Sequence, residues 1–106
     1  MFEFPRILLV DDDPDIRRIL SFNLESDGYK VVVAPTGRDA LQAVARKVPD
    51  LAIVDLLLPD MHGFEVCREI KKFLNVPIIM LTAVGTEKTI VEGLRQYAED
   101  YVVKPF

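Results

Sequence analysis

Residues 7–15 read ILLVDDDPD, four apolar residues followed by four aspartates that only Pro14 interrupts. An apolar run of this kind is typical of a strand buried in a sheet. Carboxylates crowded at one strand end repel one another and destabilise the fold, so their presence needs an explanation. Two explanations are open: a solvated turn that caps a helix, or a site for a divalent cation.

Short apolar runs recur along the chain and alternate with amphipathic segments. The runs are RILLV (6–10), KVVVA (30–34), LAIVD (51–55), PIIML (77–81) and DYVV (100–103). They are apolar without strict alternation, as in strands that are covered on both faces. Five such strands alternating with four helices predict an α/β fold, with a doubly wound, five-stranded parallel sheet.

The intervening segments carry apolar residues at helical spacing. We expect the first helix to stop at Gly28, and the second to begin at a Thr36–Asp39 capping box and to reach Val48. The third and fourth helices are indicated by Phe64, Cys67, Ile70 and Leu74, and by Ile90, Val91 and Leu94 after a cap at Thr86.

Length and composition exclude several classes of protein. The 106 residues fit one domain, and a net charge of −4 does not suit the binding of nucleic acid by this domain. The single cysteine, Cys67, rules out a disulfide framework and lies on an apolar helical stripe, where we expect a core residue. Neither a signal peptide nor a membrane span is evident, which indicates a cytoplasmic protein.

Polar residues follow four of the five predicted strands. Asp11 and Asp12 follow the first strand, Asp55 ends the third, Thr82 follows the fourth, and Lys104 follows the fifth. Because parallel strands end at the same edge of a sheet, and ligands bind there, we expect these side chains to converge. They therefore form the candidate site.

This set of residues suits phosphoryl chemistry at a metal ion. Three carboxylates without histidine or cysteine nearby favour Mg²⁺, with Mn²⁺ as an alternative. Lys104 and Thr82 can contact phosphoryl oxygens, and an aspartate beside a metal and a lysine can form an acyl phosphate. Taken singly, Lys104 reads as a surface lysine and Thr82 as a strand-end threonine. Asp13 and Asp15 fit the first turn of a helix.

Four segments at these strand ends carry a family resemblance. LLVDDDPDIRRIL, IVDLLLPDMHGFEV, PIIMLTA and DYVVKPF resemble the receiver domain of two-component response regulators, over residues 1–106 as one domain. The resemblance implies a CheY-like (flavodoxin-like) sheet of order 2-1-3-4-5. It also implies a regulatory domain, not an enzyme, that takes its phosphoryl group from a sensor histidine kinase and loses it slowly.

The resemblance also assigns roles to the acidic residues. Asp55 would be the phospho-acceptor and, with Asp12 and the backbone carbonyl of Leu57, a direct Mg²⁺ ligand. Asp11 would hold the ion through water.

Further roles concern the phosphoryl group and the signal. Lys104 and Thr82 would contact the phosphoryl group, and Tyr101 would move with Thr82 as a switch; a plain sheet residue is the alternative for Tyr101. The bond between Lys104 and Pro105 would be cis.

The chain departs from the family pattern at several positions. His62 stands in place of an acidic residue, and we expect an exposed loop residue there. Tyr97 stands in place of a glycine, so the fourth helix should end differently, because tyrosine with positive φ is costly. Apolar Leu57 and Val84, two residues beyond Asp55 and Thr82, should exclude hydrolytic water and prolong phosphorylation.

The chain ends at Phe106, before the family's fifth helix. We therefore expect a C-terminally truncated receiver domain in which one face of the fourth and fifth strands is bare. The surface of the fourth helix and fifth strand is a possible homodimer interface. The motif sequences most resemble those of the OmpR/PhoB-type regulators, whose output is DNA binding.

Two rival functions remain open. A phosphohydrolase of the haloacid dehalogenase type would use Asp11 and Asp13, although Asp15 occupies a position where that pattern requires Thr or Val. A receiver-like interaction module would act without phosphate, but such modules usually lose one of the key residues.

Overall fold

The computed structural model describes residues 4–72, 74–82 and 88–104, with the backbone alone for residues 88–91 and 94. Five strands alternate with four helices in this part of the chain. The strands are β1 (Arg6–Val10), β2 (Lys30–Ala34), β3 (Leu51–Asp55), β4 (Ile78–Thr82) and β5 (Asp100–Val103). The helices are α1 (Pro14–Ser26), α2 (Gly37–Arg46), α3 (Gly63–Lys71) and α4 (Lys88–Tyr97).

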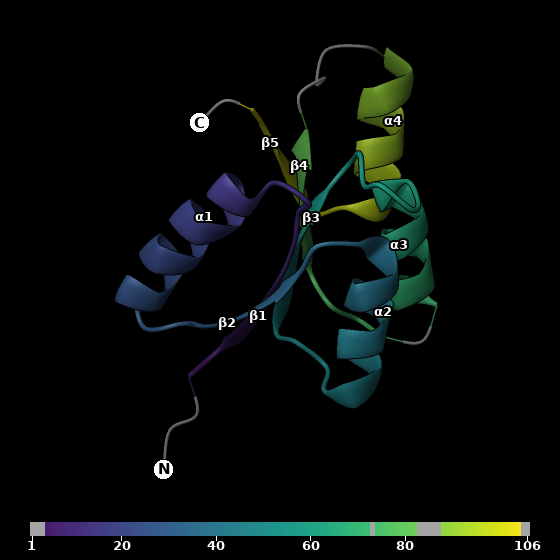
Figure 1. The fold of residues 1–106 in the computed structure, drawn as a ribbon. Coiled ribbons are helices and arrows are strands. Elements are labelled where there is room, and N and C mark those ends of the chain that lie inside the picture. The colour runs from purple at the N-terminus through teal and green to yellow at the C-terminus, as the bar shows by residue number, and fades with distance from the viewer. Residues whose placement is uncertain (1–3, 73, 83–87, 105–106) are drawn as a thin grey trace.

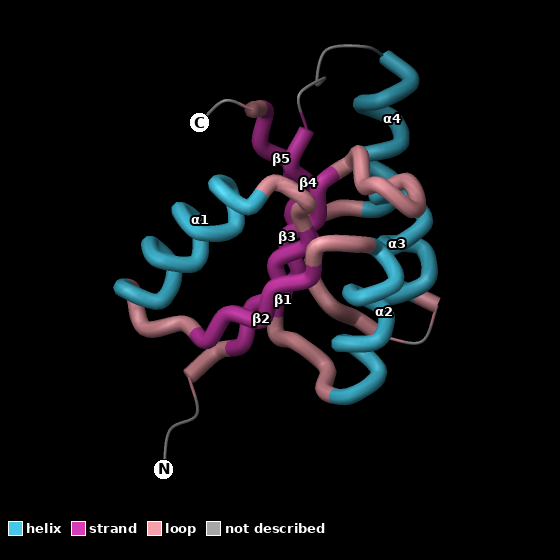
Figure 2. Tube along the Cα trace, viewed as in Figure 1, coloured by secondary structure: helices cyan, strands magenta, loops and turns pink. Residues whose placement is uncertain are grey.

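The five strands form one parallel sheet of order β2-β1-β3-β4-β5, which confirms the predicted fold class. Helix α1 lies on one face of the sheet, and α2, α3 and α4 lie on the other (Figure 1). The sheet therefore forms a central layer between two helical layers (Figure 2). No helix in the described ranges is both long and apolar enough to cross a membrane.

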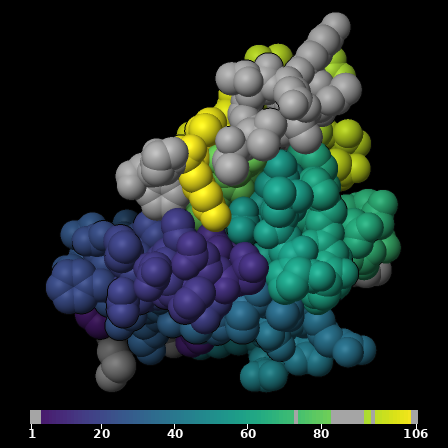
Figure 3. Space-filling view, turned by 45° about the horizontal axis from the view of Figure 1, so that its top comes forward, coloured from purple at the N-terminus to yellow at the C-terminus, as the bar shows by residue number. Residues whose placement is uncertain are grey.

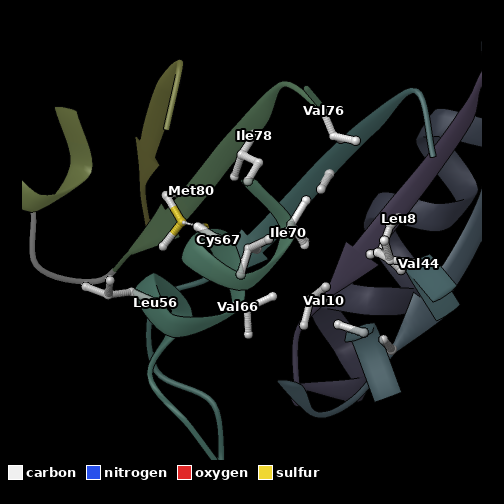
Figure 4. Packing of buried hydrophobic residues seen from close by; sticks show 14 residues of the cluster. Leu8, Val10, Val44, Leu56, Val66, Cys67, Ile70, Val76, Ile78 and Met80 are labelled. Carbon is white, nitrogen blue, oxygen red and sulfur yellow. Dashed lines mark hydrogen bonds between the residues drawn. The ribbon is translucent and has the colours of Figure 1, made fainter. Parts of the chain in front are cut away.

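The larger of two apolar cores lies between the sheet and helices α2 and α3. Val10 and Met80 from the strands lie with Val66 and Ile70 from α3, and Leu8 lies beside Val44 from α2 (Figure 4). Cys67 is fully buried in the same core, as expected. A smaller core lies under α1 and is built around Ile7, Leu9, Ile53 and Leu81. Alternate residues of β1 and β3 thus enter opposite cores, which explains why these strands are apolar between Arg6 at the start of β1 and Asp55 at the end of β3.

The edge strands do not follow the prediction that every strand is covered on both faces. Val33 of β2 is 48% exposed, and Val102 and Val103 of β5 are 39% and 43% exposed. Each edge strand has only one neighbour, so no second strand shields its side chains. Only the central strands are buried on both faces.

Most element boundaries agree with the sequence, and three do not. Thr36 caps α2, with its Oγ1 accepting a hydrogen bond from the Asp39 N–H at 3.0 Å. However, α2 ends at Arg46 and Val48 is half exposed, so its predicted extension to Val48 is wrong. Leu74 lies beyond the end of α3 but still packs against the larger core.

Strand β4 begins at Ile78, one residue later than predicted, and includes Thr82. The proposed cap Thr86 lies outside the described residues, as do Val84, Pro105, Phe106 and the side chains of Ile90, Val91 and Leu94. Gly28 has φ of 95°, and no other described residue has a positive φ. Helix α4 therefore ends at Tyr97 without strain, and the Tyr97 ring packs against Phe64 at 5.5 Å between centroids.

The face of the sheet beside α1 is less open than predicted. Leu81 of β4 is buried in the core under α1, and Ile79 packs partly against it. Val102 pairs with Leu81 in the parallel register and therefore lies on the same face, where it remains 39% exposed. Helix α1 thus covers this face as far as β4, and on the β4–β5 side the exposed apolar surface lies at the edge at β5.

Candidate functional site

The carboxyl ends of β1, β3, β4 and β5 bring together the polar residues singled out in the sequence. Asp11 and Asp12 follow β1, Asp55 ends β3, Thr82 ends β4, and Lys104 follows β5. On the surface, the start of α1 (purple) and the loop after β3 (teal) meet, and the described C-terminal end (yellow) reaches the same place (Figure 3). The predicted convergence at this edge is therefore present.

Asp11 is fully buried, and hydrogen bonds fix both its side chain and its backbone. Its Oδ1 accepts a hydrogen bond from the Asp13 N–H at 2.9 Å, and its backbone carbonyl accepts one from Arg17 Nη1 at 2.8 Å. Its Oδ2 lies 3.1 Å from Lys104 Nζ. A buried carboxylate needs such partners, because an unpaired buried charge is strongly disfavoured. No sequence pattern assigned Arg17 to this site, because its side chain contacts the backbone carbonyl of Asp11 and not a side chain of the site.

Lys104 bridges the two buried carboxylates. Its Nζ lies 3.1 Å from Asp11 Oδ2 and 3.3 Å from Asp55 Oδ2. Its backbone N–H donates to the carbonyl of Thr82 at 2.7 Å, which fixes the segment after β5 against the end of β4. Burial lowers the pKa of Lys104, but the hydrogen bond with Asp11 and the charges of both carboxylates outweigh it and raise the pKa above its usual value. Lys104 is therefore a cation in this site.

Asp55 lies at the centre of the site and is 6% exposed. Burial raises the pKa of its carboxyl group, and the charge of Asp11 raises it further, while Lys104 and the Leu57 N–H oppose this change. Gly63 allows the chain to approach closely here, since a Cβ on Gly63 would lie 2.4 Å from the Asp55 carbonyl oxygen. The start of α3 thus packs directly against the backbone of Asp55.

The acidic residues fit a divalent cation. Asp11, Asp12 and Asp55 each offer a carboxylate oxygen, and these three atoms lie within 4.8 Å of one another. Asp11 and Asp55 are buried, whereas Asp12 is exposed, so an ion here would have a route to solvent. An all-oxygen donor set of this kind suits Mg²⁺ or Mn²⁺.

Leu57, Thr82 and Tyr101 lie in or near this edge. The Leu57 side chain is 63% exposed, and its residue forms an isolated bridge with His62 across the loop after Asp55. Thr82 is buried at the end of β4. Tyr101 is half-buried on β5, where it pairs with Met80 and packs against the larger core.

His62 differs from the sequence prediction of an exposed loop residue. It is half-buried and forms the N-cap of α3, with its Nδ1 accepting a hydrogen bond from the Phe64 N–H at 3.2 Å. Its ring also packs against that of Phe64, at 4.8 Å between centroids. A histidine nitrogen thus replaces the side-chain oxygen that usually caps a helix at this position.

Asp60 is a further residue of this edge that sequence reasoning missed. Its two carboxylate oxygens accept hydrogen bonds from the Gly37 and Arg38 N–H groups, both at 2.9 Å. The Arg38 N–H holds the pKa of Asp60 below its usual range, with a further contribution from Gly37. Asp60 therefore ties the loop after Asp55 to the N-terminus of α2. No local signal reveals this contact, because its partners lie more than twenty residues away in the sequence.

The arrangement provides a buried carboxylate that can act as a nucleophile, an adjacent ammonium group, a hydroxyl group and a set of oxygen ligands. Asp13 takes no part in the cluster of carboxylates, because its Oδ1 accepts hydrogen bonds from the Asp15 and Ile16 N–H groups and caps α1. This confirms the structural explanation for Asp13, whereas the metal explanation for Asp11 and Asp12 stays a prediction.

Comparison with known proteins agrees with the resemblance seen in the sequence. A family model described as the response regulator receiver domain matches residues 7–106. The probable transcriptional regulator ycf27 of Guillardia theta is 46% identical over 101 residues, which are 95% of this chain and 40% of that protein. The protein of the same name in Galdieria sulphuraria gives the same identity and coverage. The chain thus spans about 40% of the length of these curated relatives.

Solved structures agree with the sequence relatives. The chemotaxis protein CheY4 of Vibrio cholerae has a TM-score of 0.89 and 34% identity, covering 98% of this chain and 89% of its own. A putative response regulator from Chloroflexus aurantiacus has a TM-score of 0.89 and 36% identity, covering 98% of this chain and 88% of its own. With the family model, the relatives and the fold in agreement, the chain belongs to the response regulator receiver domain family.

Proposed function

We propose that this receiver domain is a phosphorylation-dependent switch in which Asp55 accepts a phosphoryl group from a sensor histidine kinase in the presence of Mg²⁺. The observation that carries the proposal is the position of the Asp55 carboxylate. It is buried beside Lys104 at 3.3 Å and within 4.8 Å of carboxylate oxygens of Asp11 and Asp12. Phosphoryl transfer needs mainly positioning and charge neutralisation, and these groups supply both.

In the proposed reaction, a carboxylate oxygen of Asp55 attacks phosphorus and the bond from phosphorus to the kinase histidine nitrogen breaks. The histidine leaves as neutral imidazole after taking a proton from solvent. When bound, Mg²⁺ would neutralise negative charge on the transferred group, and Asp11, Asp12, Asp55 and the Leu57 carbonyl would hold it. Lys104 would exchange its contact with Asp55 for a phosphoryl oxygen.

The signal would begin at Thr82 and Tyr101. The Thr82 hydroxyl group would donate a hydrogen bond to the phosphoryl group. The side chain of Tyr101, which lies two residues before Val103 on β5, would then move. The surface of α4 and β5 would change as a result and would control an output, with a homodimer through that surface as one form. Because relatives bear the name of a transcriptional regulator, we propose that the output is the control of transcription. We also propose that the domain acts in the cytoplasm.

The structure gives less support to a phosphohydrolase of the haloacid dehalogenase type. That mechanism needs a free acid at Asp13, whose carboxylate instead accepts hydrogen bonds from two N–H groups at the start of α1. A module that acts without phosphate is also less well supported, because every residue that the phosphoryl reaction requires is present.

Incubation with acetyl phosphate, followed by intact-mass spectrometry, tests the proposal. One phosphoryl adduct is expected with MgCl₂ and none with EDTA. Asp55→Asn should abolish the adduct, whereas Asp27→Asn, an exposed carboxylate at the end of α1, should leave it unchanged. An adduct that persists in Asp55→Asn, or that forms equally in EDTA, would overturn the assignment.

A further inference from the structure

The edge of the sheet opposite the acidic site carries a basic cluster that the proposed function does not use. Arg6 and Lys30 begin β1 and β2, and Arg46 and Lys47 lie at the end of α2. We call these four residues the basic edge. The acid Asp50 lies in the same region, so this end of the molecule carries four cations and at least one carboxylate. This edge lies at the amino ends of the strands, away from Asp55.

A cavity of about 260 Å³ opens within the basic edge. Its apolar walls come from Leu8, Val32, Ala43, Val44 and Pro49, and its charged residues are Arg6, Arg46 and Lys47. Leu8 and Val44 lie side by side where α2 packs on the sheet (Figure 4). A neighbouring hollow of about 150 Å³ shares Arg6 and Lys47 and adds Lys30 and Phe4. The second hollow is also lined by Val48 and the acid Asp50, so only the first of the two combines cations with apolar walls and no carboxylate.

Ordinary structural roles account for only part of the basic edge. Arg46 and Lys47 suit the negative end of the α2 dipole. Arg6 and Lys30 begin strands and have no such role. Within the described part of the chain, none of the four forms an ion pair. The nearby acid, Asp50, uses its Oδ2 to accept a hydrogen bond from the backbone N–H of Arg6 at 2.7 Å.

We propose that this cavity binds a small amphiphilic anion, with an apolar body and one carboxylate, sulfonate or phosphate group. The apolar body would lie against Leu8, Val32 and Val44, and the anionic group would face Arg46 and Lys47, whose two positive charges outweigh the partial negative charge at the end of α2. The cavity is just below the usual size of small-molecule sites, which favours a ligand of one or two rings. Charge complementarity excludes cationic ligands, and the apolar walls disfavour bare inorganic anions.

Titration of the isotope-labelled chain with naphthalene-2-sulfonate, followed by NMR, tests the proposal. Saturable shifts are expected at Leu8, Val32 and Val44. The neutral alcohol 2-naphthalenemethanol should bind at least about fivefold more weakly, because it lacks the charge that meets two exposed cations. Methanesulfonate, which has the charge without the apolar body, should not saturate. Equal binding of the sulfonate and the alcohol would overturn the proposed role of the cations.

Two variants separate the charges from the apolar walls. The double substitution Arg46→Gln and Lys47→Gln should weaken binding of the sulfonate at least about fivefold. Arg38→Gln removes one positive charge from the opposite end of α2 and should change nothing. Ala43→Leu should fill the cavity and abolish binding. If Arg38→Gln weakens binding as much as the double substitution does, or if no saturable shifts appear, the site does not exist.

Discussion

Replacing Asp55 with asparagine removes a buried charge at nearly constant size, and we expect this change to stabilise the metal-free domain. Asp55 Oδ2 lies 3.3 Å from Lys104 Nζ, where the attraction is about 5 kcal/mol at an effective dielectric constant of about 20. An oxygen of Asp11 lies within 4.8 Å, where its repulsion is at least about 3.5 kcal/mol and offsets most of that attraction. Burial, which has the largest influence on the Asp55 carboxyl group, then makes the charge on Asp55 unfavourable overall.

The carboxylate of Asp12 contributes little to this balance, because Asp12 is exposed and water screens its charge. We therefore expect Asp55→Asn to raise the free energy of unfolding by about 1–2 kcal/mol at pH 7. Urea denaturation in EDTA measures this difference, with Asp27→Asn as the control.

The effect should depend on pH. Burial and Asp11 raise the pKa of Asp55 in the folded state, so the folded protein binds the proton more tightly than the unfolded protein does. The wild type should lose stability as pH rises from below the ordinary carboxyl value of 3.8 through the raised pKa. The advantage of asparagine should appear over this window and vanish below it. A variant that is no more stable than the wild type at pH 7 would refute the argument from burial and repulsion.

Three further substitutions test other contacts at this edge. Asp60→Ala should lower the free energy of unfolding by about 1 kcal/mol, because α2 loses two hydrogen bonds. Asp60→Asn should lose less, because its side-chain oxygen can still accept a hydrogen bond; urea denaturation measures both. Gly63→Ala should cost about 2 kcal/mol or more in the same assay, because its Cβ would meet the Asp55 carbonyl. Leu57→Asn should speed loss of the phosphoryl group, followed by intact mass over time, because a polar side chain can orient water; an unchanged or slower rate would contradict this.

The sequence predicted the sheet and the polar residues at its edge because both depend on local patterns. Apolar runs mark the buried strands, and the parallel arrangement of those strands brings Asp11, Asp55 and Lys104 together. The errors arose where the pattern continues beyond the element. Val48 keeps the helical spacing of α2, yet the helix ends at Arg46 and leaves Val48 half exposed.

Contacts between segments that are distant in sequence could not be predicted. The Asp60 carboxylate caps a helix that begins 23 residues earlier, and no short motif encodes that pairing. His62 was misread because histidine is not a common cap, although its Nδ1 can accept a hydrogen bond as an oxygen does. The roles of Leu57, Thr82 and Tyr101 depend on a phosphorylated state and remain proposals.

The most direct test of the central claim is to locate the phosphoryl group on the chain. Treatment with acetyl phosphate and MgCl₂, followed by borohydride reduction, converts an acyl phosphate of aspartate to homoserine, which peptide mass spectrometry identifies. We predict homoserine at position 55 alone, and none when EDTA replaces MgCl₂. Homoserine at position 11 or 12, or its absence from position 55 in a phosphorylated sample, would contradict the proposed role of Asp55.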